Sequence, residues 1–169
     1  EIIRYAGAQP VIIDTKEANE FKITPDQIEA AVTSNTRAIF INSPSNPTGA
    51  AYTREELESI AECALRHKLL IVSDEIYEKI VYEGFVQSSI AALDKEVQDN
   101  CVVINGVSKS YAMTGWRIGY IAASADIVKQ TGKLQGQSTS NPASISQAAS
   151  IAALNESEVD VKRMVDEFQ

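Results

Sequence analysis

Lys109 and Arg117 stand eight residues apart, in a segment that runs from Ser108 to Gly119 between two apolar runs. A lysine amine can form a covalent bond with a carbonyl compound. An arginine guanidinium binds a phosphate or a carboxylate through two parallel hydrogen bonds. The pair therefore predicts a site that holds one small molecule both covalently and by an anionic group.

Three further polar residues precede this segment: Asn46 in an Asn-Pro-Thr-Gly sequence, and Asp74 and Tyr77 in Ser-Asp-Glu-Ile-Tyr. The intervals from Asn46 to Asp74 and from Asp74 to Lys109 are 28 and 35 residues, each about one strand-helix-strand crossover. Ligands of open parallel sheets bind where the carboxyl ends of the strands converge. We therefore expect three successive strands to deliver these side chains to one crevice.

Short apolar runs predict the strands that position these residues. Four runs are near-continuous and end in a polar residue, which is typical of strands covered on both faces; they span residues 10–14, 37–42, 69–74 and 101–105. A fifth run, residues 118–123, follows too closely for a helical crossover. We expect this run to be antiparallel or to form an edge strand.

Helix signals lie between the strands. Two threonines begin N-terminal capping patterns. Thr24 has a proline directly after it and a glutamine three residues later, and Thr53 has a glutamate three residues later. From about residue 141 the pattern indicates one long helix, or two joined near Asn155. Alternating strands and helices predict an α/β fold with a mostly parallel sheet.

Composition narrows the possible functions. A length of 169 residues with 44% hydrophobic content predicts one domain, and a formal charge of −8 argues against nucleic acid as a partner. No apolar run approaches the roughly 20 residues of a membrane span. The first residue is not methionine, so we expect a fragment.

The cysteines and the histidine indicate no metal site. Cys63 and Cys101 have no CxxC spacing, and we interpret them as buried, reduced residues of a cytoplasmic protein. His67, between Arg66 and Lys68, is interpreted as a cation at the end of a helix. No group of Asp, Glu, His and Cys has metal-ligand spacing, so we predict no metal.

Pyridoxal phosphate offers groups that match the polar residues. Its aldehyde would bond to Lys109, and a buried Asp74 would keep the ring nitrogen protonated so that the ring accepts electrons. Asn46 and Tyr77 would donate to the ring oxygen, and Arg117 would bind the phosphate. The competing interpretation is a sheet whose loop residues only cap and turn; three ordered blocks favour the cofactor.

These blocks, in this order, resemble the cofactor-binding core of the pyridoxal-phosphate aminotransferases of fold type I, class I/II. The run from Tyr111 to Tyr120 is most similar to the prokaryotic-type aspartate aminotransferase branch. The resemblance implies the same five roles, with Lys109, Asp74 and Tyr77 catalytic. Gly106 stands where the family often has a phosphate-binding serine, so Ser108 is the candidate for that contact.

The resemblance also implies an architecture, a three-layer α/β sandwich that forms part of the large domain of these enzymes. Residues 1–155 would belong to this domain, and residues 156–169 would begin the helix that leads to the small domain. The segment 138–141 would approach the partner subunit of a homodimer. The phosphate-cupping loop, the ring-stacking aromatic residue and the substrate-binding arginine of the family lie outside the chain, so we expect the chain alone to be inactive.

The implied activity is transfer of an amino group between an amino acid, with aspartate as first candidate, and a 2-oxo acid, in the cytoplasm. Two alternatives stay open: another fold type I enzyme with the same cofactor, such as a lyase, and a non-catalytic aminotransferase-like regulator domain. The sequence leaves the preferred amino acid open.

Overall fold

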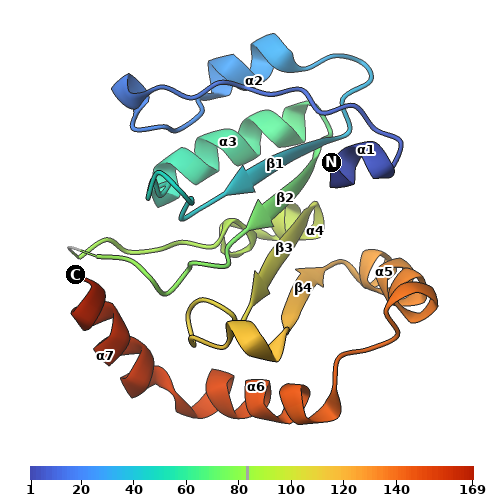
Figure 1. Ribbon diagram of the computed structural model, residues 1–169. Coiled ribbons are helices and arrows are strands. Elements are labelled where there is room, and N and C mark those ends of the chain that lie inside the picture. Colours follow the sequence, from blue (N-terminus) through green and yellow to red (C-terminus); the bar gives the residue numbers. More distant parts are fainter. Residues whose placement is uncertain (83) are drawn as a thin grey trace.

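The computed structural model describes residues 1–82 and 84–169, and these contain one sheet of four strands (Figure 1). The strands are β1 (Ala38–Asn42), β2 (Leu70–Asp74), β3 (Cys101–Gly106) and β4 (Gly119–Ala123), adjacent in that order. β1, β2 and β3 are parallel, whereas β4 is antiparallel to β3. The predicted mostly parallel sheet with one antiparallel strand is confirmed.

Helices of different lengths connect and follow the strands. They are α1 (Ile2–Tyr5), α2 (Pro25–Ala31), α3 (Arg54–Arg66), α4 (Lys95–Asp99), α5 (Ala125–Ser138), α6 (Ser144–Glu156) and α7 (Glu158–Phe168), with 3-10 turns η1 (Glu17–Asn19), η2 (Ile90–Ala92) and η3 (Thr114–Trp116). The C-terminal pattern forms two helices, α6 and α7, which meet at Ser157. None of the helices in the described part of the chain is both long and apolar enough to cross a membrane.

The two predicted capping patterns begin α2 and α3. The backbone N–H of Thr24 donates to Gln27 Oε1 at 2.9 Å. At α3 the exchange is reciprocal: Thr53 N–H donates to Glu56 Oε2 at 2.7 Å, and Glu56 N–H donates to Thr53 Oγ1 at 3.3 Å. These bonds satisfy N–H groups that a helix start otherwise leaves unpaired.

The core lies between α3 and one face of the sheet. Leu57 and Ile60 of α3 and Ile71 of β2 are buried in one apolar cluster. In β1 the alternation of a strand turns Ile39 and Ile41 into this cluster and Phe40 to the opposite face, where it is 55% exposed. The expectation that the strands are covered on both faces is therefore wrong at β1.

The first predicted strand is also wrong. Residues 10–14 have no strand pairing, and Val11 and Ile12 are 68% and 78% exposed. A strand requires a neighbouring strand whose backbone completes its hydrogen bonds. Within the described residues the edge strand β1 pairs with β2 alone, so residues 10–14 do not add a strand to that edge of the sheet. Ile13 still packs against the core, so the segment follows the surface of the domain as extended chain.

Candidate active site

The carboxyl ends of β1, β2 and β3 lie at one edge of the sheet, as their parallel arrows in Figure 1 show. Asn42, the last residue of β1, is in register with Asp74, the last residue of β2, and Asp74 is in register with Ile104 of β3. The loops that carry Asn46, Tyr77 and Lys109 start at this edge. The predicted convergence of three strand ends is therefore present.

Three predicted side chains meet at this edge from three different loops. The Asn46 side-chain amide donates to Tyr77 Oη at 3.3 Å. Lys109 Nζ lies 5.5 Å from the centroid of the Tyr77 ring, within the range of a cation-π contact. Asn46 and Lys109 are exposed and Tyr77 is half-buried, so their polar atoms are accessible to a ligand.

Asn42 holds the first of these loops in place. Its side-chain amide donates to the backbone oxygen of Asp74 at 3.2 Å, and its Oδ1 accepts from the backbone N–H of Asn46 at 3.3 Å. The role of Asn42 as a positioning residue was not predicted. The available signal was a polar residue that ends an apolar strand, as Asp74 ends the next one.

Asp74 lies at the same edge but is half-buried rather than buried as expected. Its Oδ1 accepts a hydrogen bond from the backbone N–H of Ile76 at 3.2 Å. Its second oxygen makes no hydrogen bond with the described residues. That oxygen can therefore accept a hydrogen bond from an N–H or O–H group of a ligand.

Glu75, the next residue, has the opposite environment. It is 2% exposed, and its Oε1 accepts from Ser73 Oγ at 2.9 Å, Ser89 Oγ at 3.1 Å and the Ile90 N–H at 3.2 Å. Burial raises the pKa of the Glu75 carboxyl, against the effect of these donors. Glu75 thus ties the end of β2 to η2 and anchors both ends of the loop that contains Tyr77.

Gly106, which ends β3, is required by close packing. A Cβ atom there would lie 2.8 Å from the backbone oxygen of Ile118 and 3.2 Å from Cδ1 of Ile76. The backbone contact cannot be relieved by a side-chain rotation. The absence of a serine at position 106 therefore has a structural reason in this chain.

Arg117 and Ser108 belong to the turn between β3 and β4. Arg117 has a left-handed backbone, with φ of 57°, and its guanidinium donates to the Thr114 carbonyl at 2.9 Å. Thr114 Oγ1 in turn donates to the Ser108 carbonyl at 3.0 Å. Within the described residues, neither Arg117 nor Ser108 makes a hydrogen bond to Asn46, Asp74, Tyr77 or Lys109.

A cleft of about 880 Å³ opens beside Asn46 and Tyr77. Its other lining residues include Phe21, Pro44, Tyr82 and Phe85. Apolar and aromatic walls with a few polar groups are typical of small-molecule sites. The cleft therefore provides room for a ligand beside Asn46 and Tyr77, whereas Lys109 and Asp74 are not among the described residues that line it.

Comparison with known proteins identifies the family. The sequence model described as "Aminotransferase class I and II" matches residues 1–169. The chain belongs to the class I and II aminotransferases. Family members depend on pyridoxal phosphate, so the cofactor and the family predicted from the three sequence blocks are confirmed.

Individual relatives support this assignment along the whole chain. The aspartate aminotransferases of Bacillus subtilis (strain 168) and Geobacillus stearothermophilus are 51% and 52% identical over 169 residues, which are 100% of this chain and 43% of each relative. The chain thus spans less than half the length of these relatives.

Solved structures share the fold. The aspartate aminotransferase of Rhizobium meliloti superposes with a TM-score of 0.96 at 41% identity, over 99% of this chain and 42% of that one. An aromatic aminotransferase from Pyrococcus horikoshii superposes with a TM-score of 0.93 at 39% identity, over 96% of this chain and 44% of that one. The predicted fold class is therefore confirmed.

Proposed function

We propose that the complete protein containing this chain is a pyridoxal-phosphate aminotransferase that moves an amino group between aspartate, or a related amino acid, and a 2-oxo acid. The observation that carries the proposal is the convergence of Asn46, Tyr77 and Lys109 beside Asp74 at one sheet edge. Similarity to the aspartate aminotransferase of Bacillus subtilis, at 51% identity, supports the reaction and the first-choice substrate.

The donors and acceptors at this edge fit the cofactor. The amide of Asn46 and the phenol of Tyr77, 3.3 Å apart, are donors for one ring oxygen. The second oxygen of Asp74 is an acceptor for a protonated ring nitrogen, and Lys109 is a primary amine for the aldehyde. Arg117, with Ser108, provides the donors for the phosphate.

In the proposed mechanism Lys109 has two successive tasks. Its amine would hold the aldehyde of the cofactor covalently, and the same amine, when free, would be the base that takes the α-proton of the substrate. The bound cofactor supplies the electron sink for that step. Asp74 keeps the positive charge on the ring nitrogen that makes the sink effective.

The orientation of Lys109 is a contribution of the protein. The Tyr77 ring lies 5.5 Å below the lysine nitrogen, and the Tyr77 hydroxyl is held by Asn46. Glu75 and Asn42 fix the loops that carry Tyr77 and Asn46. Such fixed geometry reduces the entropy lost when the reacting groups are brought together.

The remaining predictions concern the complete protein. A homodimer with residues 138–141 near the partner, a division after residue 155 and a cytoplasmic location are parts of the same proposal. Exposed apolar residues on the C-terminal helices support an interface there, namely Leu134, Ile145, Ile151 and Val159. An apolar surface of this kind is usually covered in the functional assembly.

Borohydride trapping tests the covalent bond. The complete protein is loaded with pyridoxal phosphate, reduced with borohydride, digested and mapped by mass spectrometry. We expect the reduced cofactor on Lys109. Lys79 is the matched control, because its Nζ also lies over a tyrosine ring, 5.8 Å from the centroid of Tyr111; a label on Lys79, or none on Lys109, would overturn the assignment.

A half-reaction separates the alternatives. With aspartate and no 2-oxo acid, an aminotransferase releases one equivalent of 2-oxo acid per site and then stops. A lyase continues to turn over, and a regulator domain releases no product. The same measurement with other amino acids determines the preferred donor.

A further inference from the structure

A second cluster of reactive side chains lies away from the sheet edge, where α2 packs on α3. Cys63 and His67 are four residues apart, so they share one face at the end of α3. Glu29, in α2, reaches the same place from the other helix. One ligand atom from each of these three residues lies within 4.8 Å of the other two.

The carboxylate of Glu29 already contacts both partners. Its Oε2 lies 2.5 Å from His67 Nε2, and its Oε1 accepts from Cys63 Sγ at 3.5 Å. Arg66 also donates to Glu29 Oε1. The Arg66 guanidinium, together with His67, holds the pKa of Glu29 at about 2, so the carboxylate is ionised at neutral pH.

These three atoms form a ligand set that zinc prefers. Zinc binds thiolate sulfur, imidazole nitrogen and carboxylate oxygen at about 2.0–2.3 Å in a tetrahedron, and sites with three protein ligands keep a fourth position for water. Bonds of that length place neighbouring ligand atoms roughly 3.3–3.8 Å apart. The sulfur-oxygen distance of 3.5 Å fits, and the nitrogen-oxygen pair would open by about 1 Å when an ion replaces the shared proton.

We propose that Glu29, Cys63 and His67 bind a zinc ion, or a divalent cation of similar ligand preference, that links α2 to α3. The thiol releases its proton to solvent as the sulfur-metal bond forms, the proton between His67 Nε2 and Glu29 moves to His67 Nδ1 or to solvent, and no electron is transferred. The thiolate and the carboxylate then balance the two positive charges of the ion.

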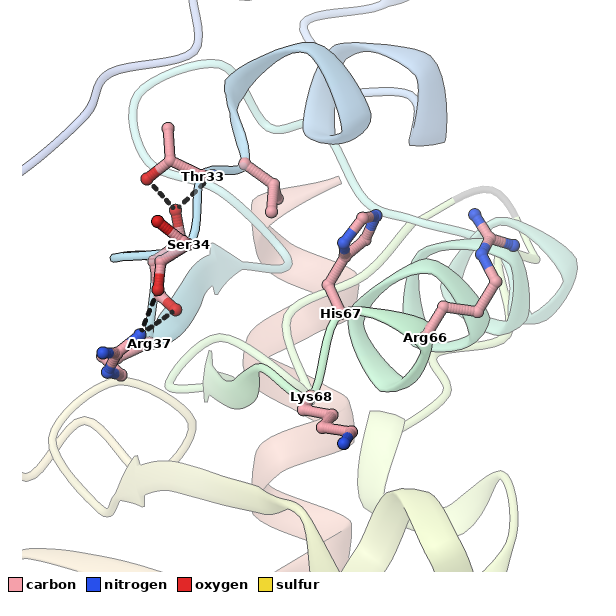
Figure 2. A pocket seen from close by; sticks show the side chains of 8 residues that line it. Thr33, Ser34, Arg37, Arg66, His67 and Lys68 are labelled. Atoms are coloured by element: carbon pink, nitrogen blue, oxygen red, sulfur yellow. Dashed lines mark hydrogen bonds between the residues drawn. The ribbon is translucent and has the colours of Figure 1, made fainter.

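The fourth position has access to solvent. His67 lines an open pocket of about 560 Å³ at this end of α3. Figure 2 shows Thr33, Ser34 and Arg37 on one side of this pocket, with His67 and Lys68 on the other. A water molecule or a small anion can therefore reach an ion held by His67.

Arg66 opposes the ion. Its guanidinium donates to Glu29 Oε1, the same carboxylate oxygen that accepts from Cys63 Sγ, and so competes with a bound cation for that oxygen. Its side chain is 60% exposed, so it can leave Glu29 and enter solvent. Burial and the neighbouring Glu29 raise the pKa of the Cys63 thiol, which makes release of the thiol proton part of the binding equilibrium.

This cluster was not predicted, because the prediction of no metal considered only spacing along the chain, whereas these three residues meet in space. The spacing of Cys63 and His67 is compatible with a metal site on a helix, but two ligands are too few. The third comes from a residue 34 positions earlier, which the packing of α2 on α3 brings near.

Cobalt substitution tests the proposal in the complete, metal-free protein without pyridoxal phosphate. A thiolate bound to cobalt(II) gives a charge-transfer absorption band, and zinc should displace the cobalt and remove the band. We expect the band in the parent protein and in Cys101→Ala, which alters the other buried cysteine, in β3. Cys63→Ala should abolish it.

Two milder variants keep the proposal testable if Cys63→Ala fails to fold. His67→Gln should weaken zinc binding at least about tenfold, because it removes a ligand from a partly exposed position. Arg66→Gln should strengthen zinc binding by up to about fivefold, because it removes the competing cation. A parent protein without the band, or zinc affinity unchanged in His67→Gln, would refute the site.

Discussion

Asp74 and Glu75 are neighbours in sequence, yet they belong to two differently built regions, the open carboxyl edge of the sheet and its packed interior. The Asp74 carboxylate accepts one hydrogen bond, on Oδ1, and its second oxygen makes none with the described residues. Glu75 is buried and accepts three hydrogen bonds on one oxygen. A buried polar group with several internal partners holds the fold, whereas a more exposed polar group with few internal partners is available to a ligand.

This comparison separates two kinds of substitution. Changes at the sheet edge should reduce catalysis and leave the free energy of unfolding nearly unchanged. Changes at the buried carboxylate should reduce stability first. Each substitution can be measured for both quantities in the complete protein.

Lys109→Ala should have the largest effect. We expect turnover to fall by at least about a thousandfold, because both the covalent bond and the base are lost. The midpoint of thermal unfolding without cofactor should stay the same, since Lys109 is exposed. Steady-state kinetics with aspartate checks the first expectation; Lys79→Ala is the control, and near-normal turnover in Lys109→Ala would contradict the comparison.

Glu75→Leu should act in the opposite way. Leucine leaves the Ser73 and Ser89 hydroxyls and the Ile90 N–H without their acceptor. Unsatisfied buried donors cost about 1–3 kcal/mol each, and partial relaxation should hold the loss of unfolding free energy near 3 kcal/mol. Urea unfolding measures it. A loss of turnover with unchanged stability would place Glu75 in the chemistry instead.

Asp74→Asn should reduce turnover by about thirtyfold, because a hydrogen bond to a charged group contributes about 1.5–3 kcal/mol and asparagine cannot keep the ring nitrogen positive. The Ile76 N–H can still donate to the asparagine oxygen, so stability should change little. Parallel kinetics and urea unfolding give both values. Equal losses of stability in Asp74→Asn and Glu75→Leu would remove the distinction between the two carboxylates.

The raised pKa of Glu75 predicts a pH dependence of stability. The folded state holds the proton more tightly than the unfolded state, whose carboxyl has the ordinary value of about 4.5. The stabilisation is therefore complete below that pH and is lost as pH rises through the folded pKa. Glu75→Gln keeps an acceptor oxygen but cannot ionise, so urea unfolding from pH 4.5 upward should show the parent losing stability relative to Glu75→Gln.

The smallest effect is expected for an exposed ion pair on α7. Lys162 Nζ lies 2.7 Å from Asp166 Oδ2, and both side chains are largely exposed. Lys162→Ala should therefore change the free energy of unfolding by no more than about 0.5 kcal/mol. Asp166→Ala is the matched control. A loss above 2 kcal/mol in either variant would show that exposure is a poor guide to the role of a polar group here.

Local signals in the sequence were sufficient to predict most of the sheet and to predict that the candidate site residues share one edge of it. The caps at Thr24 and Thr53, the three parallel strands and the distinct placement of β4, which was expected to be antiparallel or an edge strand, follow from patterns spanning a few residues. The spacing of Asn46, Asp74 and Lys109 is that of one crossover per strand, which already predicted a common edge.

Tertiary packing decided what depends on partners distant in sequence. Residues 10–14 have a strand pattern but pair with no strand in the described part of the chain, and Phe40 is an apolar side chain that is 55% exposed. Asn42 and Glu75 acquired their roles partly from groups as far as 32 and 15 residues away in the sequence. A side chain's type and spacing set which bonds it can make, whereas the packing of distant segments determines which of those bonds are already made and which are left for a ligand.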